Sequence, residues 1–230
     1  DLLTGSTSNN LFWANGGDDT VVGDAGFDLL AYDNQPNAVT VLFSAPGTGT
    51  STGLGNDQFT GIEMVLGSNG ADSMVGSSGD ETFRGSLGND TLDGGGGNDT
   101  VEYRPASAGV RVDLLLNTSS GPDGVDVLSN FEHISGSLLH SDTLIGNDSG
   151  NRIDGRGGND SISGNGGNDT LVAGTGDDTV DGGADSGGSG DTLNLLGALA
   201  AYSLSRVSNT DLLLVNAAAG ERITLRNVET

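Results

Sequence analysis

Acidic side chains recur at nine-residue intervals in this chain, and they are its strongest chemical signal. An Asp, or an Asn or Glu in its place, occupies the sixth position of each nine-residue unit. Such positions form three runs and one longer final unit: Asn10, Asp19 and Asp28; Asp72, Glu81, Asp90 and Asp99; Asp142, Asn151, Asp160, Asp169 and Asp178; then Asp191. Regularly spaced oxygen donors are suited to holding cations, so the sequence predicts a series of metal sites.

The nine-residue period also predicts how these donors come together. Six residues rich in Gly turn sharply, because Gly tolerates positive φ, and three residues remain for a short strand. Two units then make one flattened coil, and successive coils stack as parallel strands about 4.8 Å apart. Loops eighteen residues apart would lie over one another, giving the pairs Asp72 with Asp90, Glu81 with Asp99, Asp142 with Asp160, Asn151 with Asp169, and Asp160 with Asp178.

Calcium is the cation that this arrangement favours. Like charges about 5 Å apart repel, so the stack would oppose itself without a cation between its loops. Carboxylates and turn carbonyls make an all-oxygen site of flexible geometry, which suits Ca²⁺ better than Mg²⁺. Zinc is disfavoured because the chain has no Cys and only two His. We expect roughly five to eight calcium ions, bound with an affinity near the ~10⁻⁴ M of extracellular modules.

The expected sites are unequal. Asn10 and Asn151 offer an amide oxygen without charge, and Glu81 is one methylene longer than Asp, so weaker or altered sites are expected there. The ladder from Asp142 to Asp178 has full glycine loops and should bind most strongly. The Asn10–Asp28 end should be an incomplete site.

An apolar residue follows each position-six residue by two places. These residues are Phe12, Val21, Leu30, Met74, Phe83, Leu92, Val101, Leu144, Ile153, Ile162, Leu171, Val180 and Leu193. The pattern predicts a thin apolar ladder in which Ile162 stacks on Leu144, Leu171 on Ile153, and Val180 on Ile162. No single coil would bury its apolar face alone, so stability should be cooperative along the stack.

Composition narrows the classes of partner. The chain has 41 Gly, 4% aromatic residues and a formal net charge of -24, which argues against binding nucleic acid or anionic membranes. The absence of Cys excludes disulfides and thiolate metal sites. No apolar run approaches the roughly 20 residues of a membrane span.

The loops resemble the RTX family, the hemolysin-type calcium-binding repeats of consensus G-G-x-G-x-D-x-U-x. Loops such as Gly94-Gly-Gly-Gly-Asn-Asp99 and Gly164-Asn-Gly-Gly-Asn-Asp169 carry the likeness. It implies an all-β, right-handed parallel β-roll, a β-solenoid with inserted strand segments here. It also implies export by type I secretion, with folding outside the cell on meeting calcium. Further ligands implied by the family are loop carbonyls, here those of Gly85, Leu87, Gly88, Gly94, Gly96, Gly97, Gly155, Gly157, Gly158, Gly164, Gly166, Gly167, Ala173, Thr175 and Gly176.

A second, longer repeat interrupts the nonapeptides. Tyr32–Leu42 is similar to Tyr103–Asp113, and Asp57–Glu63 is similar to Asp126–Glu132. We interpret these segments as paired strands that flank polar loops at 46–54 and 117–125. The predicted division is three repeat runs (1–31, 67–102 and 136–194), two inserted β-strand segments (32–66 and 103–135) and a C-terminal β-strand cap (195–230), in one continuous solenoid. Strands are expected within the cap at 202–206, 211–215 and 222–225.

No catalytic constellation is evident, so we expect no enzyme. His133 and His140 are the only histidines, and the paired carboxylates already have a metal-binding explanation. The favoured function is a calcium-dependent structural module of a secreted cell-surface or matrix protein, of adhesin or surface-layer type. The alternative is an accessory module of a secreted protease, lipase or alginate epimerase that binds a polysaccharide. The chain begins inside the repeat pattern, so we expect it to be part of a longer protein.

Overall fold

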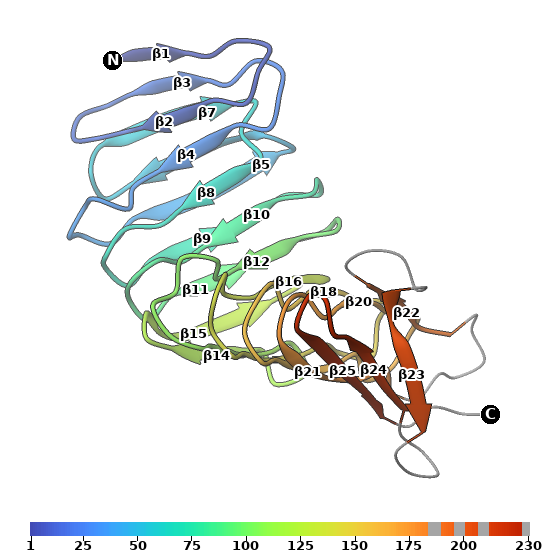
Figure 1. Ribbon diagram of the computed structural model, residues 1–230. Coiled ribbons are helices and arrows are strands. Elements are labelled where there is room, and N and C mark those ends of the chain that lie inside the picture. The colour runs from blue at the N-terminus through green and yellow to red at the C-terminus, as the bar shows by residue number, and fades with distance from the viewer. Residues whose placement is uncertain (184–189, 196–200, 207–211, 227–230) are drawn as a thin grey trace. The chain divides into compact units, whose positions relative to one another are not determined.

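The structure is a computed structural model that describes residues 1–183, 190–195, 201–206 and 212–226 (Figure 1). Contacts divide the chain into two compact units, which are described separately. The first unit comprises Asp1–Glu102 and Asp123–Phe131, and the second comprises Tyr103–Pro122 and Glu132–Thr230. None of the described segments is a helix that is long and apolar enough to cross a membrane.

The first unit contains two sheets of short strands. In one sheet the order is β1 (Leu2–Thr4), β3 (Thr20–Val22), β7 (Asn56–Thr60), β6 (Thr48–Thr52), β5 (Thr40–Ala45), β9 (Ser73–Val75), β11 (Thr91–Asp93) and β15 (Gly124–Ser129). In the other sheet the order is β2 (Leu11–Trp13), β4 (Leu29–Ala31), β8 (Met64–Leu66), β10 (Thr82–Arg84) and β12 (Thr100–Glu102). Successive repeat strands therefore alternate between the two sheets.

The second unit has the same plan. One sheet has the order β14 (Thr118–Gly121), β13 (Arg111–Asp113), β17 (Thr143–Ile145), β19 (Ser161–Ser163), β21 (Asp177–Asp181), β25 (Glu221–Arg226), β24 (Leu212–Asn216) and β23 (Ser203–Arg206). The other has β16 (His133–Ser135), β18 (Arg152–Asp154), β20 (Thr170–Val172) and β22 (Thr192–Asn194). Both units are parallel β-rolls, as the sequence predicts.

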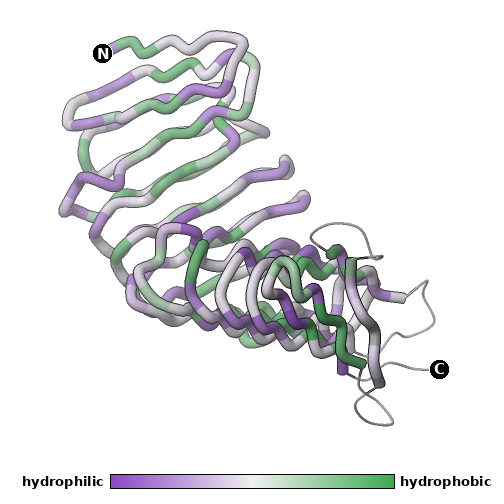
Figure 2. Tube along the Cα trace, viewed as in Figure 1, coloured by the Kyte–Doolittle hydropathy of each residue, from purple (hydrophilic) through white to green (hydrophobic). Residues whose placement is uncertain are grey.

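Strand register confirms the predicted stacking of apolar residues. Leu144 pairs with Ile162, Ile162 with Val180, and Ile153 with Leu171, all between parallel strands. The apolar residues at position eight are buried in every nonapeptide from Phe12 to Val180, and Leu193 is partly exposed. In Figure 2 the hydrophobic stretches recur along the strands, and the hydrophilic ones gather at the turns.

The inserted segment of the first unit is a three-stranded antiparallel excursion. β5 pairs with β6 and β6 with β7 in antiparallel register, while β7 lies parallel to the repeat strand β3 and β5 lies parallel to β9. The prediction that 46–54 and 117–125 are loops was wrong, because β6 and β14 occupy much of them. Residues on β6 are alternately buried and exposed, and Gly49 and Ser51 are the buried ones. This two-residue period is that of a strand with one face turned to the interior, which is why these polar residues form a strand.

The C-terminal strands β23, β24 and β25 form an antiparallel meander whose last strand pairs in parallel with β21. They correspond to the three predicted strands. The predicted first residue of the middle strand, Asp211, lies outside the described residues. The solenoid's division into six segments remains a prediction.

Candidate calcium ladders

The position-six carboxylates form ladders that link successive coils. In each link, one carboxylate oxygen accepts the backbone N–H of the position-six residue one coil earlier, which is eighteen places earlier in all pairs within the nonapeptide runs but Asp169 and Asp191. The Asp72 N–H donates to Oδ1 of Asp90 at 2.8 Å, and the Asp142 N–H donates to Oδ1 of Asp160 at 2.8 Å. The Asp160 N–H in turn donates to Oδ1 of Asp178 at 2.9 Å. The predicted pairs are thus adjacent, and Asp160 contacts both of its neighbours.

The same link occurs in the other columns of the stack. The Glu81 N–H donates to Asp99 at 2.7 Å, the Asn151 N–H donates to Asp169 at 2.7 Å, and the Asp169 N–H donates to Asp191 at 2.9 Å. At the N-terminal end, Asp28 accepts the Asn10 N–H at 2.7 Å, and Asp19 accepts the chain's amino group at 2.9 Å. Every position-six residue from Asp19 to Asp178 is buried, and Asp191 is partly buried.

The second carboxylate oxygen gives the ladders their chemistry. In Asp28, Asp90, Asp160 and Asp178, Oδ2 is buried and makes no hydrogen bond. A buried charged oxygen without a partner is costly, and such atoms are rare in folded proteins unless a water or an ion satisfies them. These four side chains therefore require either a proton or a cation.

Oxygen atoms of two loops converge at this point. A Cβ placed on Gly155 would lie 2.5 Å from Oδ2 of Asp160 and 2.5 Å from the carbonyl oxygen of Ala173 in the next coil. A Cβ on Gly164 would likewise meet Oδ2 of Asp169 at 2.1 Å and the Gly182 carbonyl at 2.5 Å. The first glycine of each loop keeps this oxygen-lined space open. Carboxylate and carbonyl oxygens are the ligands that Ca²⁺ prefers.

The carbonyls are needed because the acidic side chains alone do not surround an ion. Among the described residues, no group of three His, Cys, Asp or Glu side chains is placed to hold a metal. The predicted carbonyl donors lie in five turns: 85–88 between β10 and β11, 94–97 between β11 and β12, 155–158 between β18 and β19, 164–167 between β19 and β20, and 173–176 between β20 and β21. Their role as ligands remains a prediction.

The loops fall into two classes, which the sequence analysis did not separate. In open loops the residue at position two has positive φ, as in Asp24 (76°), Ser86 (70°) and Arg156 (71°). Their position-six carboxylates, Asp28, Asp90 and Asp160, keep Oδ2 without a hydrogen bond.

In closed loops the residue at position two turns its N–H onto the position-six side chain. The Ser68 N–H donates to Oδ2 of Asp72 at 2.6 Å, and the Ser68 hydroxyl donates to Oδ1 at 2.7 Å. The same closure links Ser6 to Asn10, Ser77 to Glu81, and Asn147 to Asn151, and Ser137 makes it to Asp142 from one place earlier in its loop. All three residues that depart from Asp lie in closed loops, and so do Asp72 and Asp142. A closed loop satisfies its own side chain without a cation.

A second ladder runs through position five. The Asn98 N–H donates to Asp80 at 2.8 Å, the Val125 N–H donates to Asn89 at 2.9 Å, and the Asp177 N–H donates to Asn159 at 2.9 Å. The frequent Asn or Asp directly before the position-six Asp explains this ladder. The position-five ladder joins successive loops by hydrogen bonds, whereas the position-six ladder contains the carboxylate oxygens that make no hydrogen bond.

Two position-six residues escaped the sequence analysis because they lie in the inserted segments. The Asp19 N–H donates to Oδ1 of Asp57, and the Asp90 N–H donates to Oδ1 of Asp126, each at 3.0 Å. The surrounding residues, Thr-Gly-Leu-Gly-Asn-Asp57-Gln-Phe-Thr and Gly-Pro-Asp-Gly-Val-Asp126-Val-Leu-Ser, fit the nine-residue pattern. Asp126 lies thirty-six residues after Asp90, a multiple of eighteen that could have revealed it.

Burial raises the pKa of three ladder carboxyls, those of Asp90, Asp160 and Asp178. Desolvation is the largest cause in each, and neighbouring carboxylates add to it: the pKa is raised to about 7 in Asp90 and Asp160, and to about 6 in Asp178. Burial also raises the pKa of Asp72 and Asp142, opposed by hydrogen bonds from the closed-loop serines and from the backbone N–H groups of Val39 and Val110. Protons and cations therefore compete for the same oxygens.

This competition predicts an unusual pH dependence. In the unfolded chain these carboxyls titrate near 3.8, so a folded value near 7 means that the folded state binds more protons between pH 4 and 7. Calcium-free protein should therefore gain stability as the pH falls from 7.5 to 5, whereas its calcium affinity should fall. The fraction of β-sheet signal that remains in chelator at the two pH values, followed by circular dichroism, measures the first effect. A smaller remaining signal at pH 5 than at pH 7.5 would contradict the assignment.

A comparison with protein families agrees with the repeat pattern. A family model for the RTX calcium-binding nonapeptide repeat matches the chain four times, at residues 1–30, 66–102, 139–171 and 163–192, which together make up just over half of the chain. No curated protein sequence matches it. Among solved structures, the extracellular lipase LipA from Serratia marcescens is similar over 100% of this chain and 38% of its own, at 15% identity and a TM-score of 0.25. The lipase's activity is not transferred on so weak a likeness.

Proposed function

Because this chain belongs to the RTX calcium-binding nonapeptide repeat family, we propose that it is a structural module that folds and stiffens a secreted cell-surface or matrix protein when calcium binds. The supporting observation is the set of buried Oδ2 atoms without a hydrogen bond in Asp28, Asp90, Asp160 and Asp178. Calcium between stacked loops would neutralise these carboxylates and join coils that repel one another without it. Binding energy would then become folding energy.

The open loops are the proposed calcium sites, and the closed loops are proposed to bind weakly or not at all. Each ion would draw on carboxylates and carbonyls of two successive loops, which makes binding to one pair favour the next. The number of ions, roughly five to eight, follows from the number of loop pairs under this proposal.

Secretion and location at a cell surface are part of the proposal. Millimolar calcium is met outside cells, and a module of extracellular affinity, about 10⁻⁴ M, would be folded there and unfolded inside the cell. The net charge of -24 would keep the unfolded chain extended and soluble before it meets calcium.

Isothermal titration tests the proposed sites. Calcium is expected to bind at several sites per molecule, and Mg²⁺ at the same concentration is expected to give little heat, because it sheds its waters reluctantly. Asp90→Asn should remove at least about one ion, since the isosteric amide keeps the link to Asp72 and loses the charge. Asp80→Asn is the matched control: Asp80 is exposed on the same unit and its amide would still accept the Asn98 N–H. Equal stoichiometry in the two variants would contradict the assignment.

A further inference from the structure

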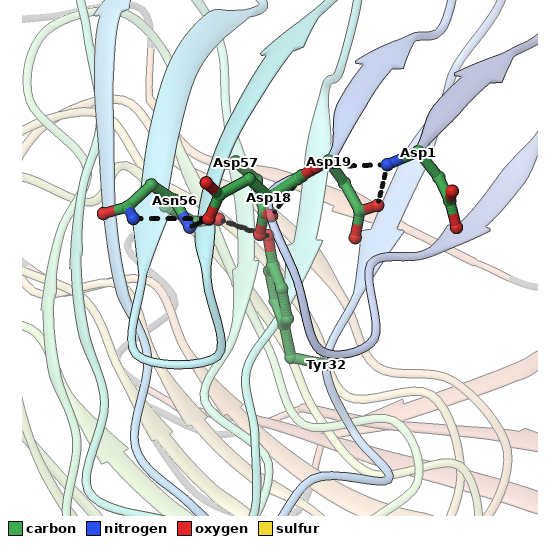
Figure 3. A network of polar contacts seen from close by, with 7 residues as sticks. Asp1, Asp18, Asp19, Tyr32, Asn56 and Asp57 are labelled. Carbon is green, nitrogen blue, oxygen red and sulfur yellow. Dashed lines mark hydrogen bonds and ion pairs between the residues drawn. The ribbon is translucent and has the colours of Figure 1, made fainter.

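The junction between the first repeat run and its inserted strands is closed by hydroxyl groups. Asp57, on β7, takes the place of a position-six carboxylate, since its Oδ1 accepts the Asp19 N–H at 3.0 Å. Its Oδ2 accepts two further hydrogen bonds, one from the Ser51 hydroxyl at 2.7 Å and one from the Tyr32 hydroxyl at 3.2 Å. Figure 3 shows the Tyr32 side chain pointing to Asp57 beside Asp19.

The contrast with the open loops is direct. In Asp90 and Asp160 the corresponding Oδ2 is buried without a hydrogen bond, whereas in Asp57 the same oxygen is satisfied by two donors. Tyr32 is 1% exposed, Ser51 1% and Asp57 2%, so water does not compete for these bonds. Burial also raises the pKa of the Tyr32 hydroxyl, which keeps it protonated as a donor at every physiological pH.

The three side chains come from three different segments. Tyr32 directly follows β4, Ser51 lies on β6, and Asp57 lies on β7. Their hydrogen bonds therefore tie the antiparallel excursion both to itself and, through Asp19, to the nonapeptide stack. Apolar packing also stabilises the antiparallel excursion, because Phe43 and Phe59 pack edge to face with ring centroids 4.9 Å apart.

We infer that the Tyr32–Ser51–Asp57 cluster is a calcium-independent lock, which holds the inserted strands in register with the nonapeptide stack while the open loops lack calcium. The inference deepens the proposed function and rests on it, since it assigns which part of a calcium-dependent fold does not depend on calcium. The closed loops support it: Ser68 with Asp72 and Ser77 with Glu81 begin the next run, directly after this excursion. Ladders would thus start from positions whose register is set before calcium binds.

Hydrogen–deuterium exchange on the whole chain tests the lock. In chelator, amides of 48–60 are expected to exchange at least about tenfold more slowly than those of 155–162, which span an open loop. With calcium, both segments should be protected. If 48–60 exchanges as fast as 155–162 in chelator, there is no lock. If instead both stay protected in chelator, calcium-dependent folding itself fails, which is a distinct outcome.

Two variants separate the lock from ordinary packing. Tyr32→Phe keeps the ring and removes the hydroxyl, and Ser51→Ala removes the second donor, so each should cost protection of 48–60 in chelator and recover it in calcium. Thr50→Ala, at the exposed neighbouring position on β6, is the matched control and should leave protection unchanged. Full protection in the combined Tyr32→Phe, Ser51→Ala protein in chelator would overturn the inference.

Discussion

Removing calcium with a chelator at pH 7.5 is expected to abolish most of the β-sheet signal in circular dichroism, and adding calcium should restore it in one cooperative transition. The reason is electrostatic: buried, ionised carboxylates without partners each cost several kcal/mol, and the ladders place them in successive coils. The apolar ladder offers little to offset this cost, because each nonapeptide buries one large apolar residue.

The residual signal in chelator is informative about the two loop classes. Closed loops and the hydroxyl-closed junction need no cation, so a minor fraction of the strands should persist. Mg²⁺ in place of Ca²⁺ is the control, and it should restore little of the spectrum. A spectrum that is the same in chelator and in calcium would rule out calcium-dependent folding.

The sequence predicted the repeat geometry well because one rule generates it. The apolar side chain at position eight of each repeat points inward, and the acidic residue at position six lies in the turn. The pairing of Leu144 with Ile162 and of Asp142 with Asp160 therefore followed from spacing alone. A repeat of this kind has few alternatives for its register, since any slip would expose the apolar ladder.

The two classes of loop could not be predicted from spacing. Ser68 and Ser86 are the same residue type at the same position of the repeat, yet Ser68 hydrogen-bonds to Asp72 while Ser86 adopts a φ of 70°. The difference lies in backbone conformation, which depends on the neighbouring coils. Serine hydrogen-bonds readily to nearby groups in turns, so both outcomes are available to it.

The nine-residue repeat also does not predict how the inserted strands pair. Polar residues such as Ser51 and Asp57 lie on the buried face because they hydrogen-bond to one another. A hydropathy pattern does not reveal such pairing. Asp57 follows Asp19 by thirty-eight residues, which is out of phase with the eighteen-residue coil. The antiparallel excursion absorbs the difference, so the spacing from Asp19 does not place Asp57 in the ladder, although the residues around Asp57 fit the nine-residue pattern.

The largest single-residue effect is expected at Asp160, in the middle of its ladder. Asp160 accepts the Asp142 N–H and donates its own N–H to Asp178, so its carboxylate borders the loop on either side. Asp160→Asn retains the size and the acceptor oxygen and removes the charge, and it should therefore weaken above all the calcium site that the Asp160 loop shares with the loop of Asp178. We expect the calcium concentration at half-folding to rise by about threefold or more, because folding is linked to every ion that the folded state alone binds.

The matched control is Asp148→Asn, which removes the same charge from an exposed position in the preceding loop. It should shift the midpoint little, since Asp148 is exposed and lies in the closed loop of Asn151, which is proposed to bind calcium weakly or not at all. The comparison separates site loss from a general decrease in negative charge, which would act equally in both variants.

The calcium-free protein gives a second check. In chelator at pH 7.5, Asp160→Asn should be more stable than the unchanged protein, because the substitution removes a buried carboxylate whose pKa is raised to about 7. The same substitution should thus weaken the calcium-bound fold and strengthen the calcium-free one, and two shifts of the same sign would contradict a role for Asp160 in holding the ion.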